Sequence, residues 1–326
     1  MNPVPRTLEE LDGQAAAFDR LVGAMPEIDR FCSSSVWVLP AAQGLHPGRR
    51  EFIFGDPEGW LTFMVTEFEP GVRALAPMDI SWGLSCPFVG PDPDALAAAF
   101  VDRALEARAG WDGILVTGLP LHSTLTLAVV RRLSQAFRIR GQQLTRRLRA
   151  DLSEGPDDFL SRRSRGFRRT LRRAQRATAT EGIRFEAAHL GDPSPDRLFA
   201  RIMDVEARSW KGQAEVGIES GPMRAFYDLM LTRLHRAGNL RLLFAQRDGR
   251  DLAYVLGGIT EGEYRGLQFS YDADEAHLSL GSLCQWTQIQ QLCVEGIVTY
   301  DLGMDMAYKH RWADHSFDTH TLWLTR

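Results

Sequence analysis

The chain has 326 residues, of which 44% are hydrophobic and 25% are charged, and its formal net charge is -4 at pH 7. This composition is typical of a globular protein long enough for two domains, and the acidic balance argues against a chain that coats nucleic acid over its whole surface. No apolar run reaches the roughly 18 residues of a membrane-spanning helix, so no membrane span is expected.

The cysteines and histidines show no metal-ligand spacing. Cys32, Cys86, Cys284 and Cys293 form neither a CxxC motif nor a Cys/His pattern, so we expect reduced thiols and no structural zinc. The three histidines 310, 315 and 320 lie on loop and strand, where a spacing of five does not bring them together, and no metal site is expected. The first residues lack the basic-then-apolar pattern of a signal peptide, which predicts a cytoplasmic protein.

The first half of the chain combines strand and helix patterns. Thr7 and Glu10 have the spacing of a capping box, which predicts a helix from Thr7 to Met25. Short apolar runs separated by Gly and Pro then predict an antiparallel meander, followed by alternating helices and strands. The predicted strands are Val36–Leu39, Glu51–Phe54, Trp60–Val65, Val72–Leu75 and Gly113–Leu119; the predicted helices are Pro91–Arg108 and Ser123–Phe137; Phe137–Leu148 suggests one or two further strands.

The second half has a similar order. It predicts strands at Ile183–Ala187, Leu240–Gln246, Ile297–Leu302 and Thr321–Leu324, helices at Pro195–Trp210, Pro222–Ala237 and Ser279–Glu295, and a hairpin that turns at residues 261–263. The whole predicts an α+β protein of two units, residues 1–150 and 151–326, with mixed, mainly antiparallel twisted sheets flanked by helices.

A run of arginines lies between the two units. It contains Arg162, Arg163, Arg165, Arg168, Arg169, Arg172, Arg173 and Arg176, and Leu160, Phe167, Leu171 and Ala174 form a narrow apolar stripe beside them. Crowded guanidinium groups repel one another unless an anion neutralises them. We therefore interpret Arg168, Arg172 and their neighbours as a docking surface for the phosphates of a cofactor or of RNA. The alternative is a solvated helix face in an arginine-rich chain.

An acid, an aromatic residue and a base stand close together in Glu206-Ala207-Arg208-Ser209-Trp210-Lys211-Gly212. Glu206 and Trp210 are four residues apart and share a helix face, and a carboxylate held against a large aromatic ring is a candidate general base. Trp210, Lys211 and Tyr227 are the candidate contacts to an acceptor substrate. The alternative is a surface glutamate beside a core tryptophan.

A second group of candidates follows the last buried strand. Asp301 and Asp305 lie at its end, and Tyr308 and Lys309 come next in the sequence YKHRW. Loops past strand ends tend to form the binding site in open α/β sheets, so Tyr308 and Lys309 are candidate ligand contacts. The alternative is a basic turn before the last strand.

The stretch Leu278-Ser279-Leu280-Gly281-Ser282 joins the hairpin to a helix. Free backbone N–H groups and the helix dipole favour an anion at such a helix start. One Gly and two Ser are a weak phosphate signal, and a plain N-cap at Ser279 or Ser282 is the alternative.

The second half, taken as a whole, resembles a known family. A basic helix (RRSRGFRRTLRRAQR) leads to ARSWKG, then to FYDLM and AGNLRLLFAQRDGRDLAYVLGG, and LQFSYDADEAHLSLGSLC, VTYDLGMD and YKHRW complete the order. This order resembles the CelD-like branch of the GNAT acyltransferase superfamily, which is similar to the Fem-type aminoacyl transferases. The resemblance covers about Asp157 to Leu324, and the first half only loosely, as a degenerate GNAT-like unit.

The resemblance implies tandem GNAT-like folds and transfer of an acyl group to an amine. It implies that the strand Ala253–Gly258 pairs with substrate and that the turn before the next helix holds the pyrophosphate of coenzyme A. Cofactor-binding residues implied in this way are Val255, Leu256, Gly257, Gly258, Ser279, Gly281, Ser282 and Leu283. The turn has one clear glycine where simple GNATs have a glycine-rich consensus, which leaves three donors open: an acyl-CoA, an acyl carrier protein and an aminoacyl-tRNA.

The mechanism that follows is attack of a substrate amine on the carbonyl carbon of a thioester or ester. Backbone N–H groups of 255–258 are the expected oxyanion donors. Glu206 and Asp301 are candidate bases, Tyr271 is a candidate acid for the leaving group, and Lys309 is an orienting cation.

Two further hypotheses stay open beside this N-acyltransferase. A Fem-like transferase would take an amino acid from tRNA bound on the arginine helix. A degenerate acyltransferase would serve as a binding protein without turnover. The acceptor, whether a small-molecule or peptide amine, cannot be read from the sequence.

Overall fold

The computed structural model describes residues 3–107, 110–190, 194–214 and 217–326. The described residues form two compact units, one of Met1–Arg146 with Phe317–Arg326 and the other of Arg147–Ser316. The last ten residues, which the domain prediction assigned to the second half, are thus grouped with the first unit. None of the described helices is long and apolar enough to cross a membrane.

The first unit is built on a sheet with strand order β1-β2-β3-β4-β6-β13-β7, with β5 paired to β3. Its pairs are antiparallel except β4 with β6, which is parallel. Its elements are β1 (Val4–Arg6), α1 (Leu8–Gly13), α2 (Ala15–Gly23), α3 (Arg30–Ser33), α4 (Ser35–Pro40), η1 (Ala41–Leu45), β2 (Arg50–Asp56), β3 (Gly59–Glu69), β4 (Val72–Pro77), β5 (Phe88–Val89), α5 (Pro93–Glu106), β6 (Gly113–Pro120), α6 (Thr124–Ala136), the first part of β7 (Arg138–Asp151) and most of β13 (His315–Thr325).

Two predictions for the first unit are wrong in detail. The run Val36–Leu39 is part of helix α4 and not a strand: extended Ser34 starts a helical turn, and three of the four residues of the run, Trp37, Val38 and Leu39, are buried. A short, wholly apolar run does not distinguish a buried strand from a buried helix. The predicted helix Thr7–Met25 is two helices, which meet at the non-helical Gln14. Its capping box at Thr7 and Glu10 is confirmed.

The second unit has strand order β7-β12-β11-β10-β9-β8. The pair β11 with β12 is parallel and the other pairs are antiparallel. Its elements are the end of β7, α7 (Gly155–Ser161), α8 (Arg165–Thr180), β8 (Arg184–Ala187), η3 (Ala188–Leu190), α9 (Pro195–Arg208), α10 (Trp210–Gln213), α11 (Gly221–Arg236), β9 (Leu240–Arg247), β10 (Arg250–Thr260), β11 (Glu263–Tyr271), η4 (Ala273–Leu278), α12 (Leu280–Val294), β12 (Thr299–Met304) and η5 (Ala307–Lys309).

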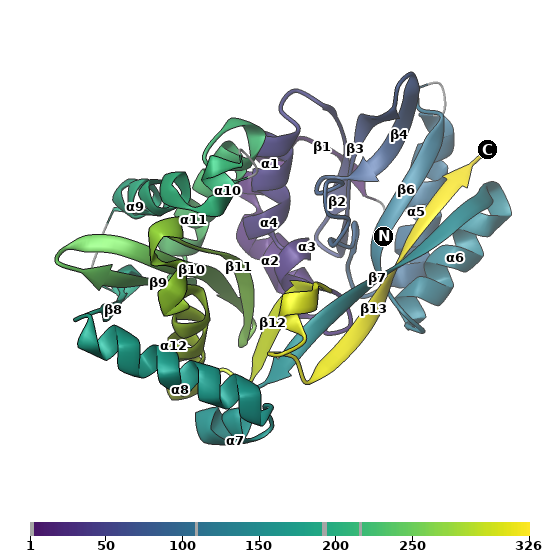
Figure 1. Ribbon diagram of the computed structural model, residues 1–326. Helices are drawn as coiled ribbons and strands as arrows, with labels where there is room; N and C mark the ends of the chain where they lie inside the picture. Colours follow the sequence, from purple (N-terminus) through teal and green to yellow (C-terminus); the bar gives the residue numbers. More distant parts are fainter. Residues whose placement is uncertain (1–2, 108–109, 191–193, 215–216) are drawn as a thin grey trace. The chain divides into compact units, whose positions relative to one another are not determined.

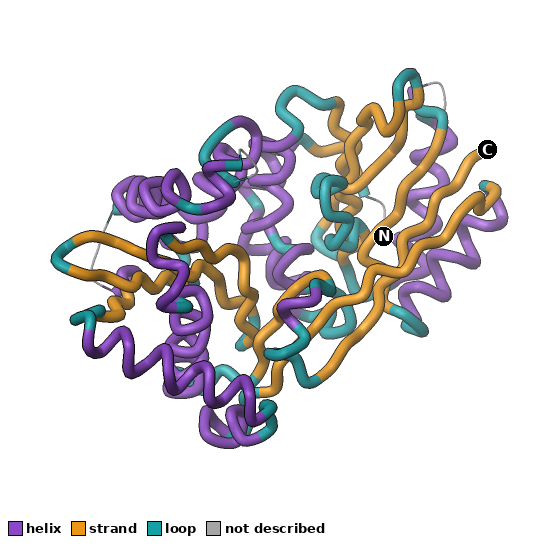
Figure 2. Tube along the Cα trace, viewed as in Figure 1, coloured by secondary structure: helices purple, strands orange, loops and turns teal. Residues whose placement is uncertain are grey.

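Helices cover both faces of the sheet in the second unit (Figures 1 and 2). Alternate residues of β10 point to opposite faces, so Tyr254 contacts α9 through Glu206 while Val255 packs with Leu280 and Cys284 of α12. Helix α8 then packs Leu171 and Ala174 against the residues of α12 that face it. The predicted hairpin is confirmed, as are the mixed α/β class and the mostly antiparallel sheets.

Candidate active site

Strands β11 and β12 separate after a short parallel pairing. The described pairs run only from Glu263 with Thr299 to Arg265 with Asp301. Beyond them lies a narrow cavity of about 40 Å³, and it is lined by Val255, Gly266, Leu267, Gln268, Phe269, Gln285, Tyr300, Leu302, Tyr308 and Lys309. The separation leaves the edge of β11 after Arg265 facing this cleft, so its backbone is positioned to pair with an extended ligand.

The predicted strand for donor contact is one strand too early. Strand β10 lies between β9 and β11, and its residues 255–258 have ladder partners on both sides. A strand paired on both sides has no open edge, which argues against the predicted oxyanion donors Val255, Leu256, Gly257 and Gly258. Val255 still lines the cleft with its side chain. Gly257 is needed for packing, because a Cβ there would meet the ring of Tyr264.

The turn into α12 lies at the end of β11. Ser279 has φ +57° and ψ +37°, and Leu280 begins the helix. The backbone N–H groups of Ser282 and Leu283 donate to Ser279 O at 3.1 and 3.2 Å. Gly281 lies against the aromatic end of β11, since a Cβ there would be 3.2 Å from Phe269 and 3.3 Å from Tyr271. Tyr271, the predicted acid, thus packs its ring against the first turn of α12.

A cavity of about 270 Å³ opens beside this turn. Its lining is Ser279 and Ser282 of the turn, Arg311, and Phe167, Thr170, Leu171 and Ala174 of α8. Arg311 is the cation at the helix start, and sequence analysis missed it although YKHRW contains it. Arg168 and Arg172, which were predicted to bind the cofactor, line a different pocket on the outer side of α8. Leu283 is buried in the core and 1% exposed.

Glu206, Lys211 and Tyr227 come together on the other face of β11. Glu206 is fully buried and accepts a hydrogen bond from the Tyr254 hydroxyl. The Lys211 Nζ atom lies 3.7 Å from Glu206 Oε1 and donates to Gln268 Oε1 at 3.0 Å and Phe269 O at 2.7 Å.

Gln268 links this group to the cleft. It lines the cavity and donates from Nε2 to the Tyr227 hydroxyl at 3.1 Å. Burial lowers the pKa of Lys211, and Glu206 and Glu219 oppose that shift. Within the described residues, Glu206 Oε2 is buried without a hydrogen-bond partner. Gln268 was not predicted, because an amide gives no titratable or motif signal. Trp210 is 55% exposed.

Asp301 is held between two buried arginines. It lies 2.6 Å from Arg147 Nη2 and 3.0 Å from Arg265 Nη1, and it accepts the Gly303 N–H at 2.7 Å. A carboxylate with these partners fixes β7, β11 and β12 together and is poorly placed to remove a substrate proton. Its geometry therefore favours a structural role over the predicted role of base.

Lys309 lies at the mouth of the same cleft. Its Nζ donates to Met304 O at 2.9 Å. Burial lowers the pKa of Lys309 to about 8, the Arg265 and Arg147 charges add to the lowering, and Asp301 and Asp305 oppose it. Tyr308 places its ring 5.7 Å from that of Phe269, and burial raises the pKa of its hydroxyl.

Comparison with known families fits this geometry. Residues 165–310 match the family described as acetyltransferase (GNAT) domain, and this segment contains both the cleft and the turn into α12. Residues 165–310 therefore form a domain of the GNAT acetyltransferase type. The match begins at α8, so the basic helix belongs to the matched GNAT segment.

Several solved structures share the fold of this protein along almost its whole length. FemX superposes with a TM-score of 0.65 at 14% identity, covering 98% of this chain and 97% of that one. The C-terminal domain of a putative lysylphosphatidylglycerol synthetase from Agrobacterium fabrum gives 0.58 at 14% identity, with 98% and 92% covered. A tandem GNAT protein from the clavulanic acid biosynthesis pathway gives 0.51 at 12% identity, with 98% and 97% covered. No curated protein matches the sequence.

These likenesses show that the chain shares its fold with FemX and with a tandem GNAT protein. The narrower CelD-like branch stays a prediction. Within the described residues, no cluster of three or more His, Cys, Asp or Glu side chains is arranged to hold a metal ion. The four cysteines are free thiols, and three of them are buried.

Proposed function

We propose that the protein is an N-acyltransferase that moves an acyl group from a thioester donor, an acyl-CoA or an acyl carrier protein, to an amine of a small molecule or peptide. The observation that carries this proposal is the cleft between β11 and β12, together with a second cavity at the first turn of α12. An extended thioester arm would pair with the open edge of β11. Its phosphate would lie at Ser279, Ser282 and Arg311, where the helix start favours an anion.

The acceptor amine would enter where Gln268 meets Lys211. The amine nitrogen attacks the thioester carbonyl carbon, the C–N bond forms, the C–S bond breaks, and the thiolate leaves and takes up a proton. Glu206 is the proposed final acceptor of the proton that the substrate amine loses. The side chain of Lys211 connects Glu206 to the cleft. Backbone N–H groups at the open edge of β11, with Lys309 beside them, would stabilise the oxyanion.

The second candidate function is a Fem-like transfer of an amino acid from aminoacyl-tRNA. Two observations favour it: the fold likeness to FemX and to a lysylphosphatidylglycerol synthetase domain, and the arginines of α8. The amine chemistry and the cleft would be the same, and an ester would replace the thioester. The third hypothesis, a binding protein without turnover, keeps the cleft and lacks the reaction.

A donor survey tests the proposal. Purified protein is incubated with a mixture of amines and, in separate reactions, with acyl-CoA thioesters, acyl carrier protein thioesters and aminoacyl-tRNA. Mass spectrometry detects the new amides. We expect amide formation with a thioester donor. Amides formed only with aminoacyl-tRNA would replace the proposal with the second candidate, and donor binding without any product would favour the binding protein.

A further inference from the structure

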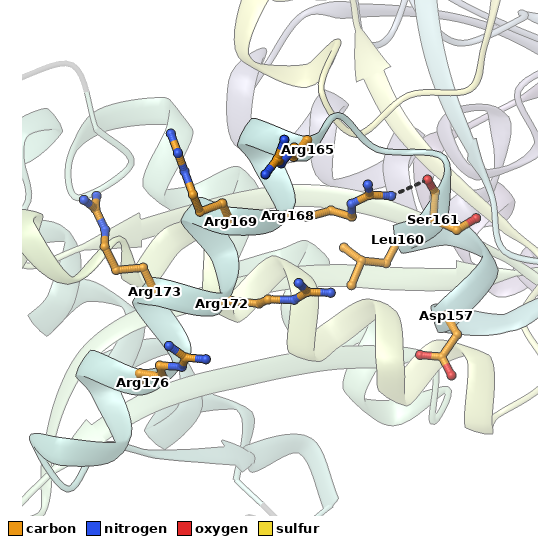
Figure 3. Close-up of a pocket in the computed structure, with 9 residues that line it drawn as sticks. All are labelled: Asp157, Leu160, Ser161, Arg165, Arg168, Arg169, Arg172, Arg173 and Arg176. Carbon is orange, nitrogen blue, oxygen red and sulfur yellow. Dashed lines mark hydrogen bonds between the residues drawn. The ribbon is translucent and has the colours of Figure 1, made fainter.

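Helix α8 carries six arginines on one side. Figure 3 shows their side chains extending from the helix, with three residues of α7 at one end. We name this surface the arginine face, and its members are Arg165, Arg168, Arg169, Arg172, Arg173 and Arg176. Their spacing of three and four residues places them opposite the buried residues Leu171 and Ala174. At 1.5 Å of rise per residue the row is about 16 Å long.

The arginine face lacks acidic partners. Among the described residues none of its members forms an ion pair, and its one side-chain hydrogen bond runs from Arg168 to Ser161 O at 2.7 Å. The neighbouring arginines differ. Arg162 and Arg163 both pair with Asp314, and Arg163 also donates to Ala313 O at 2.8 Å. The earlier arginines of the run are thus structural. Those on α8 are held close together, and among the described residues Asp157 is the one carboxylate that lines their pocket, so binding of an anionic partner would relieve their repulsion.

The arginine face lies next to the proposed donor site. The same helix supplies Phe167, Thr170, Leu171 and Ala174 to the cavity that contains Ser279, Ser282 and Arg311. The surface and the cavity are therefore separated by one helix width, about 10–12 Å with side chains. A short flexible arm can cross this distance.

We propose that the arginine face is the docking surface of an acidic carrier protein that holds the acyl group on a phosphopantetheine arm. The inference rests on the proposed function and names the source of its thioester. The acidic side chains of the carrier would pair with the guanidinium groups, its single phosphate would lie at the start of α12, and the arm would enter the cleft along β11. The acyl group then passes to the amine, and the carrier leaves with its thiol protonated.

Three features bear on the choice between a protein and the other anionic partners. Coenzyme A carries a pyrophosphate and one further phosphate, fewer anions than the six guanidinium groups of the face. The turn beside Ser279 has one glycine, which suits the single phosphate of a carrier-bound arm. An RNA on the arginine face would be held through its phosphates without base stacking, because the face has no aromatic side chain among its described residues.

The test is binding of a purified holo acyl carrier protein, measured by titration at low and moderate salt. The variant replaces Arg165→Gln, Arg169→Gln, Arg172→Gln and Arg176→Gln, and we expect its dissociation constant to rise about 10- to 100-fold at low salt. Wild-type binding should weaken as salt rises. The control replaces four exposed arginines elsewhere, Arg20→Gln, Arg49→Gln, Arg138→Gln and Arg236→Gln, and should bind as wild type does.

The inference is overturned if the wild type does not bind the carrier, or if the two variants lose affinity for the carrier equally. It is also overturned if the carrier does not bind while tRNA binds in a salt-sensitive manner that requires the arginine face. Transfer from acyl-pantetheine, which lacks the protein, should be equal in the wild type and the arginine variant. If the carrier binds through the arginine face but no donor supports acyl transfer, the docking inference stands and the proposed function is wrong. If transfer from a carrier thioester is the same in the wild type and the arginine variant, the proposed function stands and the docking inference is wrong.

Discussion

The two units repeat one order of elements and differ at one place. In each, three antiparallel strands are followed by a helix and by a strand that runs parallel to the third. In the first unit β4 pairs with β6 only at Ala74 and Leu75, and in the second β11 pairs with β12 only at residues 263–265. Both third strands therefore lose their parallel partner early.

The first unit fills the resulting gap with its own chain. The loop after β4 brings Ser85 to β6, where its carbonyl accepts the Thr117 hydroxyl at 2.9 Å. Asp79 fixes this loop from inside, accepting the Trp37 Nε1–H at 3.0 Å and the Leu84 N–H at 3.1 Å. The second unit instead lines its gap with polar and titratable side chains, among them Gln268 and Lys309.

This difference teaches that the strand order alone does not make a donor site. In the first unit the buried carboxylate Asp79 stabilises the fold by accepting hydrogen bonds from backbone N–H groups. In the second unit the buried carboxylate Glu206 lies beside the amine of Lys211 and the cleft. The contrast supports the proposal that the donor binds in the second unit and that the first is a degenerate copy. The predictions below compare matched positions in the two units.

The largest expected effect separates the two buried carboxylates. Glu206→Gln keeps a hydrogen-bond acceptor for Tyr254 and removes the proton acceptor, so the rate of acyl transfer should fall about 10²- to 10⁴-fold. Asp79→Asn should leave transfer per folded molecule unchanged and lower the free energy of unfolding by about 1–3 kcal/mol, because backbone donors lose a charged acceptor. Steady-state kinetics and chemical denaturation measure both. A Glu206→Gln protein with full activity would remove the proposed base.

A smaller effect should appear in the pH dependence of the cleft. Lys309 loses its charge as pH rises through about 8, so transfer that uses this cation should decline above that pH. Lys309→Arg keeps the charge, and its pH–rate profile should lack the decline. Rates that rise through pH 8 in the wild type would instead make Lys309 the base.

The same lysine links pH to stability. Because the folded-state pKa of Lys309 lies below its ordinary value of 10.5, the fold favours the neutral amine. Its contribution to stability is fully present above pH 10.5 and is lost as pH falls through about 8. The free energy of unfolding should be measured across this pH window for the wild type and for Lys309→Met. The difference between the two proteins should shrink as pH rises.

The smallest expected effect concerns two residues with left-handed backbone. His122 (φ +62°) stands just before the N-cap of α6 in the first unit, and Ser279 (φ +57°) starts α12 in the second. Glycine at either position should raise the free energy of unfolding by about 1 kcal/mol, because an L side chain is strained there. Only Ser279→Gly should also raise the donor KM, about two- to tenfold, through loss of a hydroxyl at the phosphate site. Equal KM values in both variants would argue against a phosphate at this turn.

The sequence predicted the elements whose signals are local. The capping box at Thr7, the hairpin at 261–263 and the amphipathic α8 depend on neighbours in the chain, and the structure contains all three. The strand prediction for Val36–Leu39 is wrong because a run of four apolar residues has no polar position from which a period could be read. Glu206, Lys211 and Tyr227 could be predicted as candidates from their residue types, although they lie on three successive helices, α9, α10 and α11.

The remaining features of the site depend on tertiary pairing. Which strand edge faces the donor is decided by where β11 leaves β12, and nothing local in Leu267 or Phe269 marks that point. Gln268 and Arg311 can be identified as site residues only from the groups that the fold places beside them. Asp301 is a candidate base from the sequence, but the fold places Arg147 of β7 and Arg265 of β11, which are far from it in sequence, at its oxygens.

The most direct test of a donor site at the start of α12 is thiol release from the thioester donor in the presence of acceptor amine. Gly281→Trp places a large side chain against Phe269 in the second unit, and Ala95→Trp makes the matched change in the first turn of α5. Thermal unfolding confirms that both variants fold, with Gly281→Ala as the milder substitution. The account predicts that Gly281→Trp abolishes thiol release and that Ala95→Trp releases thiol at the wild-type rate. Undiminished release by folded Gly281→Trp would contradict it.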